Sequence, residues 1–253
     1  MLNRHEVIYK NTFVPALVFA LFIAALPQFV QFHPIHIVNL LLIRVFDRLF
    51  TLFKNEQPVS ALFDCGFVSG LMALLFFPAI LMLPLLLISL VILRSFKIKE
   101  WIIIIIAFLI PFFFISVYTF WNHSLRLFWS DYFSHFRNLG SSLDLQMTTS
   151  IKVTSIFIGL LLILALFKLR INYRKNMIRM RTYQQIFFIF LLFSAASLLL
   201  IRQIHFVDFA FLIIPVSVFC AYYFVSAKRR VFLYEYSLWV LIGLIVWNQM
   251  GGL

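Results

Sequence analysis

Two pairs of polar residues have the types and spacing that could support chemistry at a membrane surface. His36 follows His33 by three residues and Asp208 follows His205 by three, so each pair could lie on one helical turn. Imidazole and carboxylate groups could bind zinc or iron, or act as a general base on a lipid-linked substrate. However, Pro34 interrupts the first pair, and histidine is common at membrane interfaces. We therefore treat these four residues as candidate catalytic residues and expect no bound metal or cofactor.

Charged residues inside apolar segments form a second candidate site. Asp64 lies about 9 Å from the start of its predicted helix, and Arg48 lies at about the same depth on the preceding, oppositely directed helix. A carboxylate in hydrocarbon costs several kcal/mol unless a partner compensates it, so we predict an ion pair between the two residues. The pair either fixes the register of the helices or takes part in proton or ion movement.

Arg44 and Asp47 complete this predicted charge cluster. Their spacing of three residues allows them to pair along one face of a helix. Such a pair could simply allow the helix to enter a membrane, or it could bind an anionic lipid headgroup. The predicted intramembrane cluster therefore comprises Arg44, Asp47, Arg48 and Asp64.

The composition indicates a helical membrane protein. Hydrophobic residues make up 64% of the chain and charged residues 12%, against about half and about a quarter in soluble domains. The net charge of +12 does not indicate nucleic-acid binding, because the basic residues lie between apolar segments. The connectors are too short to fold alone, so we predict a single transmembrane domain over residues 1–253.

Residues 59–94 form the apolar stretch that we expect at the packing centre. As one helix this stretch would be about 53 Å long, whereas the hydrocarbon core of a bilayer is about 30 Å thick. Because proline removes a backbone donor, we predict a break at Phe77 and Pro78, and hence a transmembrane hairpin. Gly66 and Gly70 form a small-residue stripe on its first arm, which could contact another helix, a protein partner or a second copy.

Apolar runs predict about nine membrane spans and one further helix. Outside the hairpin, the predicted spans are residues 12–32, 34–53, 101–118, 151–169, 185–201, 206–227 and 231–247. Residues 34–53 either span the membrane or lie in its interface, and we prefer the spanning interpretation. An amphipathic helix at about residues 121–137 is predicted to lie flat on the extracytoplasmic surface. The predicted fold class is an all-α polytopic transmembrane bundle.

The distribution of basic residues predicts the orientation. Of the 21 Lys and Arg residues, fifteen fall on one side, four fall on the other, and Arg44 and Arg48 fall within a span. The richer side should be cytoplasmic, and it includes the amino terminus. Its longest connector should contact anionic headgroups of membrane lipids through Lys168, Arg170, Arg174, Lys175, Arg179 and Arg181.

Short motifs along most of the chain resemble an uncharacterised family of polytopic inner-membrane proteins from Bacteroidota. The motifs are Phe13-Val14-Pro15-Ala16-Leu17, Leu62-Phe63-Asp64 with Gly66, Phe76-Phe77-Pro78-Ala79, Lys99-Glu100-Trp101 followed by Pro111, and His205 to Asp208 with Ile214-Pro215. The resemblance implies a bacterial inner-membrane location and no particular activity. Members of that family begin further upstream, so it also implies that one or two leading helices are missing here.

Motifs typical of enzymes are missing from the sequence. We find no P-loop, Gly-x-Ser-x-Gly, His-Glu-x-x-His or Cys-x-x-Cys pattern. We therefore expect a structural or partner-binding component of the cell envelope. One alternative is an enzyme or transporter that uses the candidate catalytic residues on a lipid-linked glycan or another lipid. The other is proton or ion movement through Asp64 and Arg48.

Overall fold

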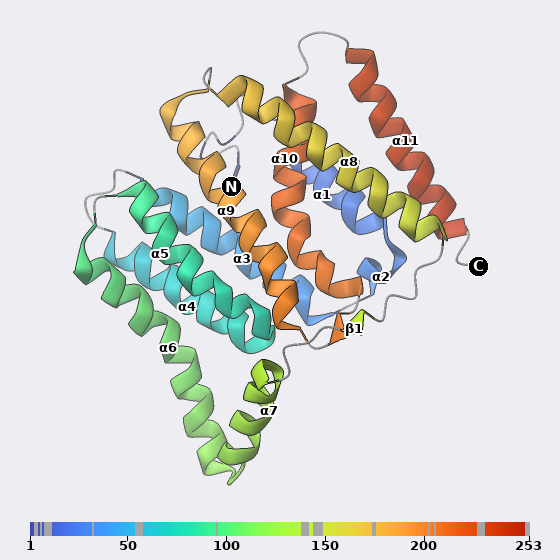
Figure 1. Cartoon of the computed structure of the whole chain (residues 1–253). Coiled ribbons are helices and arrows are strands. Elements are labelled where there is room, and N and C mark those ends of the chain that lie inside the picture. The colour runs from blue at the N-terminus through green and yellow to red at the C-terminus, as the bar shows by residue number, and fades with distance from the viewer. Residues whose placement is uncertain are drawn as a thin grey trace.

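The protein is a bundle of helices (Figure 1). The structure, a computed structural model, describes residues 1–2, 5, 7, 12–31, 33–53, 58–94, 96–137, 142–143, 149–173, 176–201, 203–204, 206–226 and 231–250. The elements are α1 (Val14–Ala24), α2 (Pro27–Val30), α3 (Pro34–Thr51), α4 (Val59–Leu75), η1 (Phe77–Leu81), α5 (Met82–Leu93), α6 (Ile98–Trp121), α7 (Leu125–Arg137), β1 (Ser142–Leu143), α8 (Thr149–Asn172), α9 (Ile178–Ser197), η3 (Leu198–Leu200), β2 (Gln203–Ile204), η4 (Phe206–Leu212), α10 (Ile213–Val225) and α11 (Val231–Met250). The two short strands pair in parallel, with Ser142 opposite Gln203.

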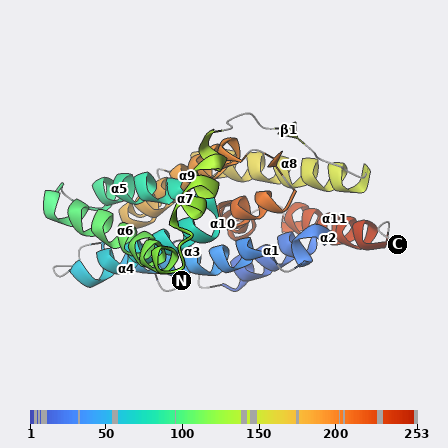
Figure 2. The same cartoon turned by 90° about the horizontal axis from the view of Figure 1, so that it is seen from below.

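The helices lie in two layers around α10. Seen from below, α5, α9 and α8 lie along one side and α4, α3 and α1 along the other, with α10 between them (Figure 2). α10 is the most enclosed helix, since residues 213–222 are all buried. The hairpin of α4 and α5, which we expected at the packing centre, lies at one end of the molecule, where α4 packs against both α3 and α6 (Figure 1).

The structure confirms the helical membrane class but not nine spans. Among the described residues, four helical segments are long and apolar enough to cross a membrane, namely Ile98–Trp121, Thr149–Asn172, Ile178–Leu200 and Phe206–Val225. Three apolar helices are shorter, namely Val14–Ala24, Val59–Leu75 and Phe77–Leu93. α3 has 18 residues but carries three charged side chains, which makes its insertion costly.

Proline divides the first predicted span into two helices. Leu26 has an extended conformation with φ −127° and ψ 116°, and Pro27 begins α2. The ring of a proline disfavours helix in the preceding residue, which accounts for this break. Residues 12–32, which we predicted as one span, therefore contain an 11-residue α1 followed by the separate helix α2.

The predicted break in residues 59–94 is confirmed. α4 ends at Leu75, Phe76 is extended with φ −143° and ψ 103°, and Pro78 lies at the start of η1. The N–H of Phe76 still reaches the Met72 carbonyl at 2.9 Å, so the first arm is capped by its own backbone. The turn therefore begins one residue before the position that we predicted from the proline.

α6 occupies the glycine stripe of α4. A Cβ atom at Gly66 would lie 2.6 Å from the Ile104 carbonyl oxygen, and one at Gly70 would lie 2.3 Å from the Phe108 carbonyl oxygen. The glycine hydrogens must therefore point at these oxygens, as in the Cα–H···O contacts of closely packed helices. From the first contact to the second, the position moves four residues forward along both helices, so α4 and α6 run in the same direction. This direction is expected because α5, which lies between them in the chain, runs the opposite way. The face that we considered for an external partner is thus covered by α6.

α6 and α7 form an arm that extends from the bundle (Figure 1). α6 is longer than the predicted span, and a turn with φ 54° at His123 reverses the chain into α7. The predicted amphipathic helix is present, but its aromatic face packs against protein. Tyr132 donates a hydrogen bond to the Ala73 carbonyl at 3.1 Å, and its ring lies 5.1 Å from the ring of Phe77.

The contact between α4 and α6 predicts that the same substitution, glycine to alanine, lowers stability much more at Gly70 than at Gly243. Gly70→Ala should destabilise the protein by about 1–3 kcal/mol, because the new methyl group would overlap the α6 backbone. Gly243→Ala on α11 is the matched control, since nothing lies within 4 Å of its added Cβ. Thermal unfolding in detergent measures both. Equal melting temperatures for the two variants would contradict the α4–α6 packing.

Candidate functional site

His33 and His36 both bond to nearby backbone. His33 is the N-cap of α3, and its Nδ1 accepts a hydrogen bond from the Ile35 N–H at 3.4 Å. His36 Nε2 lies 3.0 Å from the Gln31 carbonyl oxygen, so this nitrogen carries the hydrogen and donates. Both imidazoles therefore fix the entry into α3, which is the ordinary role of a polar side chain at a helix start.

Of the other two candidate catalytic residues, the structure describes only Asp208. His205 lies outside the described residues. Asp208 is buried in η4, and among the described residues no hydrogen bond joins it to His33 or His36. No three His, Cys, Asp or Glu side chains in the described part of the chain are grouped so that they could hold a metal ion. The contact between α3 and η4 is made instead by Asn39, whose Nδ2 donates to the Ala210 carbonyl at 3.0 Å.

The predicted ion pair between Arg48 and Asp64 is present. Arg48 Nε lies 3.1 Å from Asp64 Oδ2, and each side chain is a little over one third exposed. The N–H group is not directed at the carboxylate, so the contact is an ion pair without a well-formed hydrogen bond. One residue further along α4, the buried Cys65 thiol lies 3.6 Å from the Val45 carbonyl oxygen. These two contacts fix the register of α3 against α4.

Asp47 does not pair with Arg44. Its Oδ1 lies 3.0 Å from Nε2 of the buried His5. Arg44 is exposed and forms no ion pair with any described residue. A spacing of three residues shows only that two side chains can meet. The prediction failed because Asp47 contacts a residue of the amino-terminal segment instead. The predicted cluster is therefore two separate pairs and one exposed arginine.

An aromatic and cationic cluster lies around His5. The His5 ring is edge-on to Tyr183 on α9, with 6.4 Å between ring centroids. The Tyr183 hydroxyl donates to the Phe50 carbonyl at 3.2 Å and accepts from Arg179 Nε at 3.0 Å. The Arg179 guanidinium also lies over the ring of Phe53, at 5.9 Å from its centroid. This cluster, which the sequence analysis missed, connects the amino terminus, α3 and α9.

The cluster changes the interpretation of the basic connector. Arg179 contacts Phe53 and Tyr183, and Arg181 lies over the Tyr173 ring at 5.9 Å. These two guanidiniums therefore contribute to packing, and their contact with lipid headgroups stays a prediction. Arg170 is exposed and Lys168 is half-buried, whereas Arg174 and Lys175 lie outside the described residues.

A second ion pair is buried where α5 is followed by α6. Arg94 Nη2 lies 3.5 Å from Glu100 Oε1, and both side chains are largely buried. Glu100 is in the first turn of α6, where the helix dipole favours a negative charge. The sequence contains an indication of this pair that we did not use. Opposite charges at the two ends of so short a connector lie close enough to pair.

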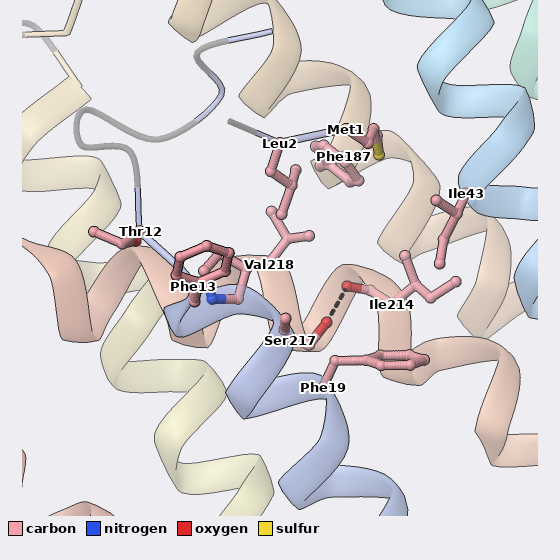
Figure 3. Close-up of a pocket in the computed structure, with 12 residues that line it drawn as sticks. Met1, Leu2, Thr12, Phe13, Phe19, Ile43, Phe187, Ile214, Ser217 and Val218 are labelled. Carbon is pink, nitrogen blue, oxygen red and sulfur yellow. Dashed lines mark hydrogen bonds between the residues drawn. The ribbon is translucent and has the colours of Figure 1, made fainter. Parts of the chain in front are cut away.

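An apolar cavity of about 280 Å³ lies between the amino terminus, α1, α3, α9 and α10. Figure 3 shows mostly aliphatic and aromatic side chains on its wall, with Thr12 and Ser217 as the polar ones. The Ser217 hydroxyl donates to the Ile214 carbonyl at 2.8 Å, so it already has a partner. These walls offer packing surface and no constellation of acid, base and nucleophile.

Comparisons with family models, curated proteins and solved structures found no match. The resemblance to the Bacteroidota family therefore stays a prediction.

The Arg48 and Asp64 pair can be tested by a double-mutant cycle. Arg48→Gln and Asp64→Asn should be non-additive, with a coupling of about 0.5–1 kcal/mol, as expected for polar contacts between membrane helices. Arg44→Gln is the control, and it should show no coupling to Asp64→Asn because Arg44 is exposed and forms no ion pair with any described residue. The free energy of unfolding in mild detergent gives the cycle. A coupling of zero would mean that the pair does not hold α3 against α4.

Proposed function

We propose that this protein is a polytopic component of the bacterial inner membrane with a structural or partner-binding role in the cell envelope. Nine helical segments, α1, α3, α4, η1 with α5, α6, α8, α9 with η3, η4 with α10, and α11, coincide with the nine predicted apolar runs. The shorter ones can still cross where the bilayer thins around the protein. The parallel direction of α4 and α6 agrees with this arrangement. The amino terminus is then cytoplasmic by the distribution of Lys and Arg.

The arm of α6 and α7 is the observation that carries the partner-binding role. Three ring systems hold α7 on α6, with centroids 6.3 Å apart for Phe112 and Trp129 and 5.9 Å apart for Phe112 and Tyr132. Burial raises the pKa of Tyr132 to about 12, so its hydroxyl stays protonated and can donate to Ala73 at neutral pH. The arm is therefore held in place by specific contacts at its base.

The outer face of α7 mixes apolar and polar groups. Leu127 and Phe133 are more than half exposed, and Arg126 and Ser130 are exposed between them. By contrast, apart from Lys99 in its first turn, the exposed residues of α6 are apolar or aromatic, as expected for contact with lipid, and include Ile102, Ile106, Leu109, Phe113 and Phe114. A surface with arginine and large apolar side chains together is typical of protein interfaces. We therefore assign partner binding to α7, at the extracytoplasmic surface.

The two alternative functions have less support from the contacts. An enzyme or transporter that uses His33, His36, His205 and Asp208 would need imidazoles that are available to a substrate, and the first two bond to backbone. Proton or ion movement through Arg48 and Asp64 would need a path, and the pair lies beside a contact that fixes helix register.

The proposed topology predicts which positions a membrane-impermeant thiol reagent can reach. In a chain whose Cys65 and Cys220 are replaced by serine, His123→Cys should react in spheroplasts because it lies in the turn between α6 and α7. Met177→Cys, exposed before α9, should react only after the membrane is permeabilised. The reverse pattern would contradict the orientation.

Partner binding by α7 can be tested with a photo-crosslinking amino acid in living cells. At Leu127 or Phe133 it should give one discrete protein adduct, whereas at Ile163, an equally exposed position on α8, it should give only lipid adducts. Tyr132→Phe should lower the α7 adduct without reducing the amount of protein, because it removes only the bond to Ala73. Identical products at α7 and Ile163 would contradict the proposal.

A further inference from the structure

A second cavity lies at one end of the bundle between α1, α2, α8, η4 and α10. Its volume is about 290 Å³, and its wall is almost entirely apolar. It is lined at the end of α1 by Phe22 and Leu26 and at the beginning of α10 by Ile213. In the proposed topology all these helix ends lie in the outer leaflet of the membrane. We call this cavity the outer groove.

The face of α8 that lines the outer groove changes from apolar to polar along its length. Leu162, Ile158 and Gly159 line the inner part, and Ser155 follows one turn toward the start of the helix. The Ser155 Oγ is buried and has no hydrogen-bond partner among the described residues. Lys152, three residues before Ser155, continues the same stripe and is exposed. From Leu162 to Lys152, over about 15 Å of helix, this face of α8 therefore presents apolar side chains, then a hydroxyl group and then a cation.

This order matches the chemistry of a phospholipid. We propose that the outer groove binds one acyl chain of an anionic phospholipid, with the ester carbonyl near Ser155 and the phosphate near Lys152. The hydroxyl of Ser155 can donate to an ester carbonyl oxygen, and a lysine near the end of a span extends its ammonium group toward the headgroups. The proposal does not depend on partner binding by α7.

The size and charge of the groove favour this occupant. Its volume is about ten times the share of one water molecule in the liquid, and a methylene group is of similar size, so the groove has room for about ten methylene groups of one acyl chain and not for two chains. The 3₁₀ residues that line the groove, Phe206, Phe209 and Leu212, share one face of η4, whereas Asp208 lies on another. The described charge nearest the groove on α8 is therefore the positive one of Lys152.

Photoactivatable lipids can test the proposal with the full chain. The protein is placed in nanodiscs of equal parts phosphatidylglycerol and phosphatidylcholine, with a trace of either lipid carrying a diazirine in its acyl chain. Mass spectrometry then locates the adducts. We expect labelling on the groove-lining parts of α8 and α10, with about five-fold more from the phosphatidylglycerol probe, as one lysine near a membrane surface should give.

Two variants separate the chain site from the headgroup site. Gly159→Phe should fill the groove and abolish this labelling without disturbing the fold, because nothing lies within 4 Å of the added Cβ. Gly243→Phe, equally open on α11 and outside the groove, should label like the wild type. Lys152→Gln should keep the labelling but reduce the preference between the two lipids to about one.

Three results would overturn the proposal. The first is unchanged groove labelling in Gly159→Phe, and the second is equal labelling by the two lipids in the wild type. The third is a wild-type dimer in the nanodisc whose groove the lipid probes do not label and which Gly159→Phe dissociates, because the occupant would then be a second copy of the chain.

Discussion

The contact between the glycine stripe of α4 and the backbone of α6 is the constraint on which the rest of this end of the protein depends. In lipid the hydrophobic effect does not drive helices together, so close backbone approach must supply the attraction. Gly66 and Gly70 allow α6 to lie against α4, and Ala73, one turn further, accepts the hydrogen bond of Tyr132. The same helix therefore contacts and positions both α6 and α7. On its other side α4 is tied to α3 by Arg48 and Asp64.

Several polar side chains in the described core join helices, whereas buried hydroxyl groups such as those of Thr154 and Ser217 bond within their own helix. Asn39 reaches the Ala210 carbonyl, Tyr183 reaches Phe50, and Asn248 of α11 donates to the Ala25 carbonyl at 2.8 Å. Each of these bonds meets a backbone carbonyl at or near a helix end, where such groups lack a partner within the helix. A bundle made of short helices has many such ends. Polar groups that bond to these carbonyls hold neighbouring elements together.

Part of this arrangement could be predicted from the sequence because its causes are local. Proline predicted the break at Pro78, and helical rise predicted that Arg48 and Asp64 meet at equal depth. The glycine stripe predicted a close neighbour but not its identity, since small residues show where a helix can approach and not which one does. His5 and Asp47 were beyond prediction because His5 lies in a segment without periodicity. The number of spans could not be predicted from composition, because proline shortens helices whose apolar composition indicates a full-length span.

The claim that α6 occupies the α4 stripe within one chain can be tested most directly by disulfide crosslinking. Ala73 and Phe112 belong to one buried cluster, whereas Phe113 is exposed on the other side of α6. In a chain without the native cysteines, Ala73→Cys combined with Phe112→Cys should form an intramolecular disulfide under mild oxidation, and Ala73→Cys combined with Phe113→Cys should not. A covalent dimer from the first pair, or equal crosslinking by both pairs, would contradict the account.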